Sequence, residues 1–221
     1  IFKSTTQELL NGKNKIYEWK KIKIGDIGEF TGNGVDKKIK EDEQTIRLLN
    51  FMDIMHLNFI HKNVSKHFVT ASKEKIDKCS VKKGDIFLTP SSETRVDIGV
   101  SAVAMEDIDD LVYSYHIVRF RPTIKMDLLF RAYIFKNQKF LNQASTICEG
   151  SGKRYVCSNK KFASFELEFP IDVREQKDIA SKLYTMEKEL NMLKNKAVKY
   201  KKIKEGMMED LLTGKVRLNY E

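Results

Sequence analysis

A heptad spacing of apolar side chains near the C-terminus constrains the fold of this chain more than any other feature. From Ile179 to Tyr200 the apolar residues follow one another at steps that alternate four and three, which is typical of a helix packed along another helix. After Tyr200 the seam shifts its register, as it does at a stutter. The residues predicted to pair are Ile179, Leu183, Met186, Leu190, Leu193, Ala197, Tyr200, Ile203, Met207 and Leu211.

The heptad pattern predicts one long helix over residues 171–214. Gly214 suits its C-terminal end, because glycine takes the left-handed conformation without strain. Such a helix spans roughly 60 Å at about 1.5 Å per residue, which is long for the domain that precedes it. We therefore expect a helix that projects and forms a coiled coil. The alternative is an amphipathic helix that lies on its own domain.

Upstream of this helix the pattern is mixed. Residues 18–170 are rich in aromatic and β-branched side chains with frequent turn signals, and residues 1–17 form a short polar lead of helical character. Strands are predicted at 19–27, 45–51, 86–89, 100–105, 113–120 and 162–169, and a helix at 127–141. Pro170 is expected to end the last strand, since it lacks a backbone N–H. The predicted fold class is α+β, a mixed α/β domain at 18–170 followed by the helical region 171–221.

The two ends of the central domain carry similar short segments. Residues 7–13 and 209–215 share a Leu-Leu pair, a glycine and a lysine in the same register. The match predicts that the chain is one repeat of a two-repeat protein, with the tail of the preceding repeat attached at residues 1–17.

Charge and cysteine content limit the partners and the compartment. The chain has 40 Lys and Arg residues against 31 Asp and Glu, a net charge of +9. This excess favours nucleic acid before a membrane surface, although many soluble proteins are equally basic. No apolar stretch approaches the ~20 residues that a membrane span needs. Three cysteines without a CxxC spacing argue against disulfides and zinc and fit a reducing cytoplasm.

The motifs of common catalytic sites are absent from the sequence. The prolines Pro90, Pro122 and Pro170 are isolated, which excludes the Asn/Asp-Pro-Pro-aromatic motif of amino-methyltransferases, and no P-loop occurs. Asp85 follows a glycine and is interpreted as a turn residue. The acidic cluster at 107–110 is interpreted as a solvated loop, and the glycines at 28–34 as a loop or bulge. We therefore predict no catalytic site, no metal site and no cofactor in this chain.

Two polar segments have side chains suited to DNA. One follows an apolar strand at 90–98, and the other, at 149–161, combines glycines with basic residues; such side chains reach phosphates and base edges. Residue type equally allows ordinary hairpins with solvated tips. Tyr115 is expected to pack in the core. The candidate DNA contacts are Lys37, Lys38, Ser91, Ser92, Glu93, Thr94, Arg95, Lys153, Arg154, Tyr155, Asn159 and Lys160.

Several stretches together resemble the specificity subunit of type I restriction–modification systems. Residues 19–27 are similar to the family's entry into a target recognition domain, and residues 81–89 with 98–99 to its strand-turn motif. Residues 169–170 with 175–180 resemble the entry into its spacer helix, and residues 206–218 the exit. The order of these motifs and their spread over nearly the whole chain make the resemblance specific.

The resemblance implies a non-catalytic subunit that reads one half of a split site in double-stranded DNA. It also implies that two spacer helices pair antiparallel and set the distance between the half-sites. Methyltransferase subunits would supply S-adenosylmethionine chemistry on adenine, and restriction subunits ATP-driven cleavage. Because the chain has one recognition domain and not two, it is expected to be half of a longer subunit or a half-size version that forms a homodimer.

Two other functions stay open on sequence grounds. The chain could be the recognition end of a fused restriction–methylation enzyme, which a catalytic motif upstream of Ile1 would reveal. It could also be a coiled-coil interaction protein that binds no DNA, in which case mixed-sequence DNA would migrate unchanged in its presence.

Overall fold

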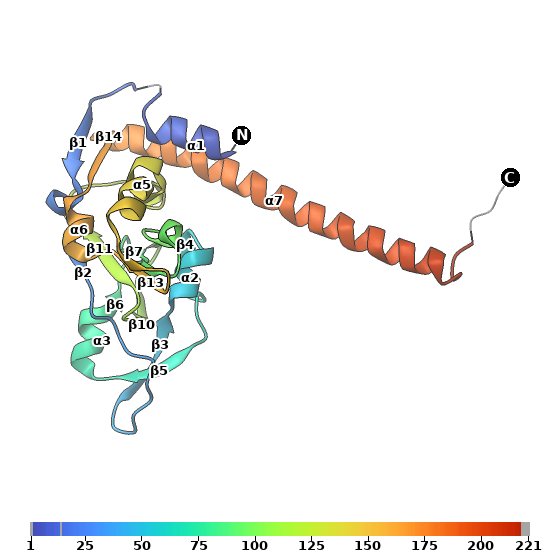
Figure 1. Ribbon diagram of the computed structural model, residues 1–221, viewed down its shortest axis with the longest axis horizontal. Helices are drawn as coiled ribbons and strands as arrows, with labels where there is room; N and C mark the ends of the chain where they lie inside the picture. Colours follow the sequence, from blue (N-terminus) through green and yellow to red (C-terminus); the bar gives the residue numbers. More distant parts are fainter. Residues whose placement is uncertain (1, 14, 218–221) are drawn as a thin grey trace.

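A computed structural model describes residues 2–13 and 15–217 (Figure 1). It consists of a body of small sheets and short helices, from which the 40-residue helix α7 (Val173–Leu212) extends far to one side. Helix α1 (Phe2–Leu10) lies along the first turns of α7 and runs in the opposite direction. The outer ends of the predicted regions 1–17 and 171–221, and Leu218 of the exit motif, lie outside the described residues.

The body is organised around two mixed sheets. The five-stranded sheet has the order β2-β11-β7-β9-β4, in which only β4 and β9 are parallel. Its strands are β2 (Gly28–Thr31), β11 (Val118–Pro122), β7 (Ile86–Leu88), β9 (Ser101–Ala104) and β4 (Phe59–Ile60). The four-stranded sheet has the order β5-β3-β10-β6, with β3 and β10 parallel. Its strands are β5 (Phe68–Ala71), β3 (Gln44–Leu49), β10 (Ile108–Tyr113) and β6 (Ser80–Val81).

Strand β7 separates two buried clusters. Ile86 and Leu88 point into the first cluster and Phe87 into the second, as the two-residue period of a strand requires. The first cluster contains a group of aromatic rings in which Phe140 lies 4.8 Å from Phe135 and 5.9 Å from Phe165, between ring centroids. Because both faces of β7 are covered, its sequence is a continuous apolar run and not an alternating one.

Short helices cover the sheets and interrupt several predicted elements. The α-helices are α2 (Phe51–His56), α3 (Lys73–Cys79), α4 (Leu128–Arg131), α5 (Gln138–Ile147) and α6 (Asn159–Ser164). The 3-10 helices are η1 (Ile24–Asp26), η2 (Arg95–Asp97) and η3 (Ile134–Lys136). The helix predicted at 127–141 is wrong as one element. It is divided into α4, η3 and the start of α5, and Asn137 caps α5 by accepting a hydrogen bond from Lys139 N at 2.8 Å.

Four predicted strands also need correction, and the one at 45–51 ends at Leu49 as β3. Residues 113–120 are not one strand, because β10 ends at Tyr113 and a turn closed by Ile117 N and Ser114 O at 3.0 Å precedes β11. Residues 162–165 belong to α6 and its end, so only β14 (Glu166–Pro170) is extended. The strand predicted at 19–27 ends with β1 (Trp19–Lys23), where η1 begins. The predicted strands at 86–89 and 100–105 are confirmed within a residue at each end.

The start of α7 is fixed to the N-terminal lead by one buried carboxylate. Glu175 accepts hydrogen bonds from the backbone N–H of Ile16 and Tyr17 and, at 3.0 Å, from Trp19 Nε1. Strand β1 pairs antiparallel with β14, directly before the helix. Hydrogen bonds to a buried charged acceptor contribute about 1.5–3 kcal/mol each. The direction in which α7 leaves the body is therefore set by its first turn.

A second polar contact fixes α7 three turns further on. Tyr133 Oη donates to Glu187 Oε2 at 2.7 Å, Asn58 Nδ2 donates to the same carboxylate, and Lys136 Nζ donates to Asn58 Oδ1. Burial lowers the pKa of Lys136 to about 8, although the charge of Glu187 acts in the opposite direction. From residue 191 to residue 209 every side chain of α7 is exposed. The predicted long helix is confirmed, and Gly214, at φ +71°, follows its end.

Candidate nucleic-acid interface

The two polar segments singled out in the sequence lie side by side in one small sheet. Strand β8 (Ser91–Ser92) pairs with β13 (Arg154–Val156), which forms a hairpin with β12 (Glu149–Ser151). Arg154 Nη2 donates to Ser91 Oγ at 3.1 Å across the pair, and Cys157 N donates to Pro90 O at 2.8 Å. Segments some 60 residues apart in the chain thus form one surface.

A cleft of about 720 Å³ opens beside this sheet. Its walls are helix α2, the loop after β8, the tip of the β12–β13 hairpin, the turn before β11 and the loop at Lys37. The lining residues are Lys37, Phe51, Met52, Met55, His56, Ser91, Ser92, Glu93, Thr94, Asp97, His116, Lys153 and Arg154.

The cleft brings together seven of the twelve residues predicted to contact DNA. These are Lys37, Ser91, Ser92, Glu93, Thr94, Lys153 and Arg154. The five that do not line it are Lys38, Arg95, Tyr155, Asn159 and Lys160. Lys38 pairs with Asp36 at 3.3 Å, and Asn159 and Lys160 open helix α6. Which of the twelve touch DNA stays a prediction.

Arg95 shows why residue type alone did not place the contacts. Its guanidinium donates to Ser145 O at 3.2 Å and to Cys148 O at 3.4 Å, at the C-terminal end of α5. It also lies 4.5 Å from the ring centroid of Tyr155. A cation at a helix C-terminus is favourable because the last carbonyls are otherwise unpaired. Arg95 therefore joins the end of α5 to the Tyr155 ring, and neither residue lines the cleft.

Asp97 orders the loop that forms one wall of the cleft. Its carboxylate accepts hydrogen bonds from Thr94 Oγ1 at 2.5 Å and Ser92 Oγ at 3.2 Å. Thr89 Oγ1 donates to the backbone carbonyl of the same residue at 2.5 Å. These bonds hold the Ser92 and Thr94 hydroxyls at the rim, so the loop is shaped before any ligand arrives.

Helix α2 is the part of the cleft that the sequence did not reveal. It places Phe51, Met52, Met55 and His56 on the cleft wall, whereas the sequence predicted a strand up to residue 51. The sequence does contain a signal for this helix, because Asn50 is followed three residues later by Asp53. In the structure the two form a capping box, in which the N–H of Asn50 donates to Asp53 Oδ2 at 2.8 Å. Apolar side chains at a polar cleft supply contact with base methyl groups.

The turn at 114–117 also differs from expectation. Tyr115 was predicted to pack in the core, but its side chain is 48% exposed because β10 has already ended. Its ring lies 3.8 Å from that of His116, which lines the cleft. Burial, and then the nearby charges of Lys37 and Arg154, lower the pKa of His116. His116 is therefore neutral at pH 7 and offers one donor and one acceptor.

The acidic residues weighed as catalytic candidates have structural partners. Asp85 is a turn residue, as interpreted: its carboxylate accepts from Lys82 N at 3.0 Å and takes two bonds from Arg121, at 2.6 and 2.7 Å. Asp110 is not in a loop but in β10, where it pairs with Arg47 at 2.6 Å. Within residues 2–13 and 15–217, no three metal-binding side chains gather, and the three cysteines are free and buried.

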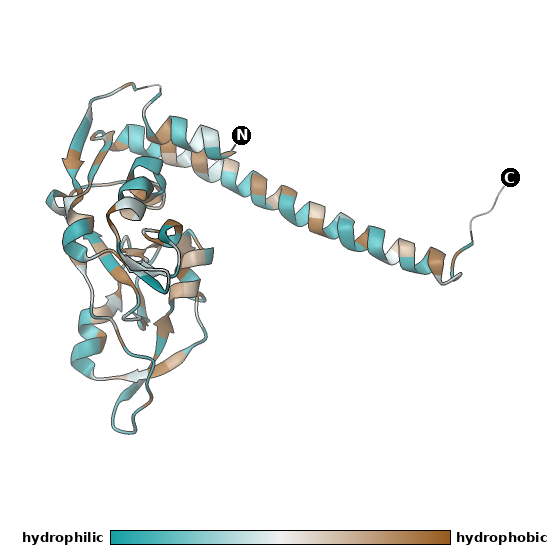
Figure 2. Ribbon diagram, in the orientation of Figure 1, coloured by the Kyte–Doolittle hydropathy of each residue, from teal (hydrophilic) through white to brown (hydrophobic). Residues whose placement is uncertain are grey.

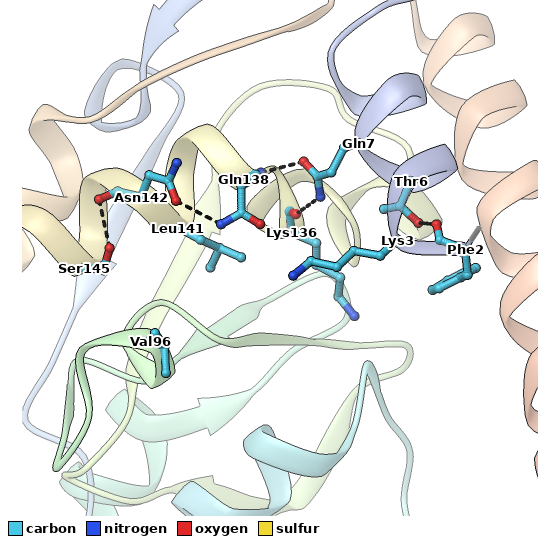
Figure 3. A pocket seen from close by; sticks show the side chains of 10 residues that line it. All are labelled: Phe2, Lys3, Thr6, Gln7, Val96, Lys136, Gln138, Leu141, Asn142 and Ser145. Carbon is cyan, nitrogen blue, oxygen red and sulfur yellow. Dashed lines mark hydrogen bonds between the residues drawn. The ribbon is translucent and has the colours of Figure 1, made fainter.

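Helix α1 is seated on the body by specific hydrogen bonds (Figure 3). Gln7 Nε2 donates to Lys136 O at 2.9 Å, and Gln7 Oε1 accepts from Gln138 N at 2.7 Å. Asn137 Nδ2 donates to Leu10 O at 2.9 Å. A pocket of about 440 Å³ lies between α1, α5 and Val96. Helix α1 is thus part of the folded body.

The structure thus combines a cleft rimmed by Lys37, Lys153 and Arg154 with a long projecting helix. In comparison with known proteins, residues 17–200 match the family of the type I restriction modification DNA specificity domain. The chain belongs to this family, and the specificity subunits of type I systems are non-catalytic.

Solved structures share the fold. The S subunit from M. genitalium is 15% identical with a TM-score of 0.55, and the match covers 89% of this chain and 46% of that one. The HsdS subunit from Thermoanaerobacter tengcongensis is 11% identical with a TM-score of 0.59, covering 95% and 50%. A chain from a type I R-M system studied for complex assembly is 11% identical with a TM-score of 0.62, covering 94% and 52%.

This chain spans about half the length of those structures. At these identities the likeness shows the α+β fold with its long C-terminal helix. In the part of the chain that the structure describes, helices fall short of the length and apolarity that a membrane crossing requires.

Proposed function

We propose that this chain reads one half of a split DNA target through the cleft between α2 and the β8–β13–β12 sheet. The observation that carries the proposal is the pairing of β8 with β13, which unites two polar segments in one preformed surface. Lys37, Lys153 and Arg154 supply charge for phosphates, and the Ser92 and Thr94 hydroxyls, which Asp97 orders, are of the kind that hydrogen-bonds to phosphates and base edges. The chain itself is proposed to hold no cofactor.

The spacer role is supported by the unpartnered part of α7. Beyond residue 190 its predicted pairing residues Leu193, Tyr200, Ile203 and Met207 are all exposed. Figure 2 shows hydrophobic bands that recur along the projecting part of the helix. A continuous apolar stripe of this kind marks an interaction surface. We propose that a second helix of the same kind covers it antiparallel, and that the pair holds two recognition domains at a fixed distance.

Helix α1 supports the antiparallel arrangement. It shares the Leu-Leu and glycine pattern of the end of α7, and both segments finish at a glycine with φ +71°, Gly12 and Gly214. It packs against the start of α7 in the opposite direction (Figure 1). We propose that α1 corresponds to the end of a preceding spacer helix. The second helix then comes from another half of a longer chain or from a second copy.

The partners proposed for the assembled module are methyltransferase subunits and restriction subunits. The non-catalytic nature of specificity subunits supports this division, since the chemistry on DNA has to come from other chains. The rigid start of α7, fixed by Glu175 and Glu187, offers a frame on which such subunits could be held in a constant orientation.

The cleft is tested by DNA affinity. The double variant Lys153→Gln with Arg154→Gln should weaken binding of a mixed-sequence duplex about 10-fold and lower the salt dependence of log K by about 2, because two phosphate contacts are lost. Fluorescence anisotropy across a salt series measures both. Lys177→Gln, an exposed residue on α7, is the matched control. Equal effects of the double variant and this control would contradict the proposed interface.

A further inference from the structure

Two cysteines lie opposite each other at the base of the β12–β13 hairpin. The last pair in the register of this hairpin is Glu149 with Val156, so the next position places Cys148 opposite Cys157. Residues directly opposite in an antiparallel pair present their side chains on the same face. The two cysteines match no CxxC spacing in the sequence, and only the register of the hairpin brings them together.

The backbone hydrogen bonds show what kind of cross-strand position this is. Cys157 N donates to Pro90 O at 2.8 Å, and Cys148 N donates to Ala144 O at 3.2 Å, at the end of α5. Neither N–H donates to the other cysteine, as expected of a non-hydrogen-bonded pair. The Cα atoms of such a pair are typically about 4.5 Å apart. A disulfide spans Cα separations of about 4.4–6.8 Å, so the position suits one.

The surroundings of the two thiols differ. Cys148 is 4% exposed and Cys157 is 1% exposed, and both are free. Arg95 Nη1 lies 3.7 Å from Cys148 Sγ, where a guanidinium stabilises the negative charge that a sulfur carries as it attacks. Burial raises the pKa of Cys157 to about 12, and the nearby Cys148 adds to the rise, whereas Lys161 opposes it. Cys148 therefore suits the attacking role, and Cys157 the role of the second thiol.

Strand β12 gives a route to the buried sulfur of Cys148. This strand directly follows Cys148, lies at the edge of the β12-β13-β8 sheet and has three exposed residues. Segments with few buried contacts open locally without unfolding of the rest of the protein. Opening of β12 uncovers Cys148, so a small oxidant reaches it while the body stays folded.

We propose that Cys148 and Cys157 form an oxidation site, at which hydrogen peroxide converts the two thiols to a disulfide. The Cys148 thiolate attacks one peroxide oxygen, the O–O bond breaks, and the departing oxygen takes up a proton and leaves as water. The Cys157 sulfur then attacks the sulfur of the resulting sulfenic acid. The S–O bond breaks, and the hydroxyl leaves as water with the Cys157 proton. Two electrons pass from the sulfurs to the peroxide.

The disulfide closes the base of the hairpin that carries Lys153 into the cleft. It links α5 to the end of β13, so β12 between them can no longer open freely. The chemistry involves no DNA. The inference is therefore independent of the proposed function, and its tests use the chain without DNA.

Peptide mapping of the full chain tests the crosslink. After peroxide treatment and alkylation, the free thiols should fall from three to one. Trypsin cleaves after Lys153 and Arg154, so Cys148 and Cys157 fall on separate peptides that mass spectrometry should find joined until dithiothreitol is added. Cys79→Ala is the matched control, because Cys79 is equally buried but belongs to the other cluster. It should lose both remaining thiols to the same crosslink.

The single variants test the order of attack. Cys157→Ala should accumulate a sulfenic acid at Cys148 that dimedone labels, whereas Cys148→Ala should be labelled far less at Cys157. Circular dichroism checks that both variants fold. Three free thiols in peroxide-treated native chain, or a crosslink that involves Cys79, would overturn the proposal. Equal dimedone labelling of the two variants would overturn the assigned order.

Hydrogen exchange tests the effect on the hairpin. Amides in residues 149–156 should exchange severalfold more slowly in the oxidised native chain than in the reduced chain, because opening of β12 is restricted. Peroxide-treated Cys157→Ala should show no such slowing. Unchanged exchange in a native chain that carries the disulfide would contradict the restraint.

Discussion

Lys136 is a cation held mostly inside the protein, between η3 and the helix α7. Burial lowers its pKa to about 8 from an ordinary value of 10.5. Between these values the unfolded chain binds more protons than the folded chain, so folding stability rises with pH across this window. Below pH 8 both states are protonated and the cost of the buried charge is constant.

Lys136→Met should remove this pH dependence. The free energy of unfolding of the native chain, relative to that of the variant, should rise by about 1–3 kcal/mol from pH 8 to pH 10. Urea unfolding at a series of pH values measures the difference. Lys139→Met, at an exposed neighbour, should keep the native slope; a flat difference between the native chain and Lys136→Met would contradict a buried lysine here.

At the scale of single residues, the sequence predicted local roles, such as that of a turn residue, better than it predicted where a side chain points. Asp85 was interpreted correctly as a turn residue because Gly84 precedes it, a purely local signal. Arg95 and Tyr115 carried no such signal. Which way their side chains face depends on α5 and on the end of β10, and neither is encoded in the neighbouring residues.

At the scale of elements, the β12–β13 hairpin depends on one glycine. Gly150 has φ +127°, and a Cβ at this position would lie 2.0 Å from the carbonyl oxygen of Arg154. A non-glycine residue in such a conformation is strained by about 1–3 kcal/mol, and here it also collides with backbone. The tip of the hairpin carries Lys153 into the cleft.

Gly150→Ala should therefore weaken DNA binding severalfold while the body stays folded, since Gly150 is exposed and belongs to neither buried cluster. Anisotropy and circular dichroism give the two readouts. Gly152→Ala is the matched control, because a Cβ there meets nothing within 4 Å. If both glycine variants bind DNA like the native chain, the hairpin is not part of the interface.

The elements differ in how far the sequence predicts them. Helix α7 was predictable because its heptad spacing lies within one continuous stretch of the sequence. Recognising that spacing does not require knowing how distant segments pair. Strands β7 and β9 were visible as short apolar runs. The pairing of β8 with β13 was not predictable, because strands two residues and three residues long carry no register information across 60 positions. The sequence therefore indicated two separate polar segments and not one cleft.

At the scale of the whole molecule, every side chain of α7 from residue 191 to residue 209 is exposed. We predict that a second helix covers it, so the chain should have the mass of a dimer in light scattering unless its other half is supplied. Leu193→Ser with Ile203→Ser should shift this mass toward the monomer, because the buried seam loses about 2–5 kcal/mol per large-to-small change. Val198→Ser, an exposed apolar residue off the predicted seam, is the control.

The most direct test of the proposed function is a photo-crosslink from the cleft to DNA. A benzophenone side chain at Glu93, which is exposed and lines the cleft, is compared with one at Lys160, which is exposed outside it. With a mixed-sequence duplex at low salt, we predict crosslinking from position 93 well above that from position 160. Crosslinking from position 160 alone, or from neither position while the chain binds DNA, would show that DNA lies on another surface.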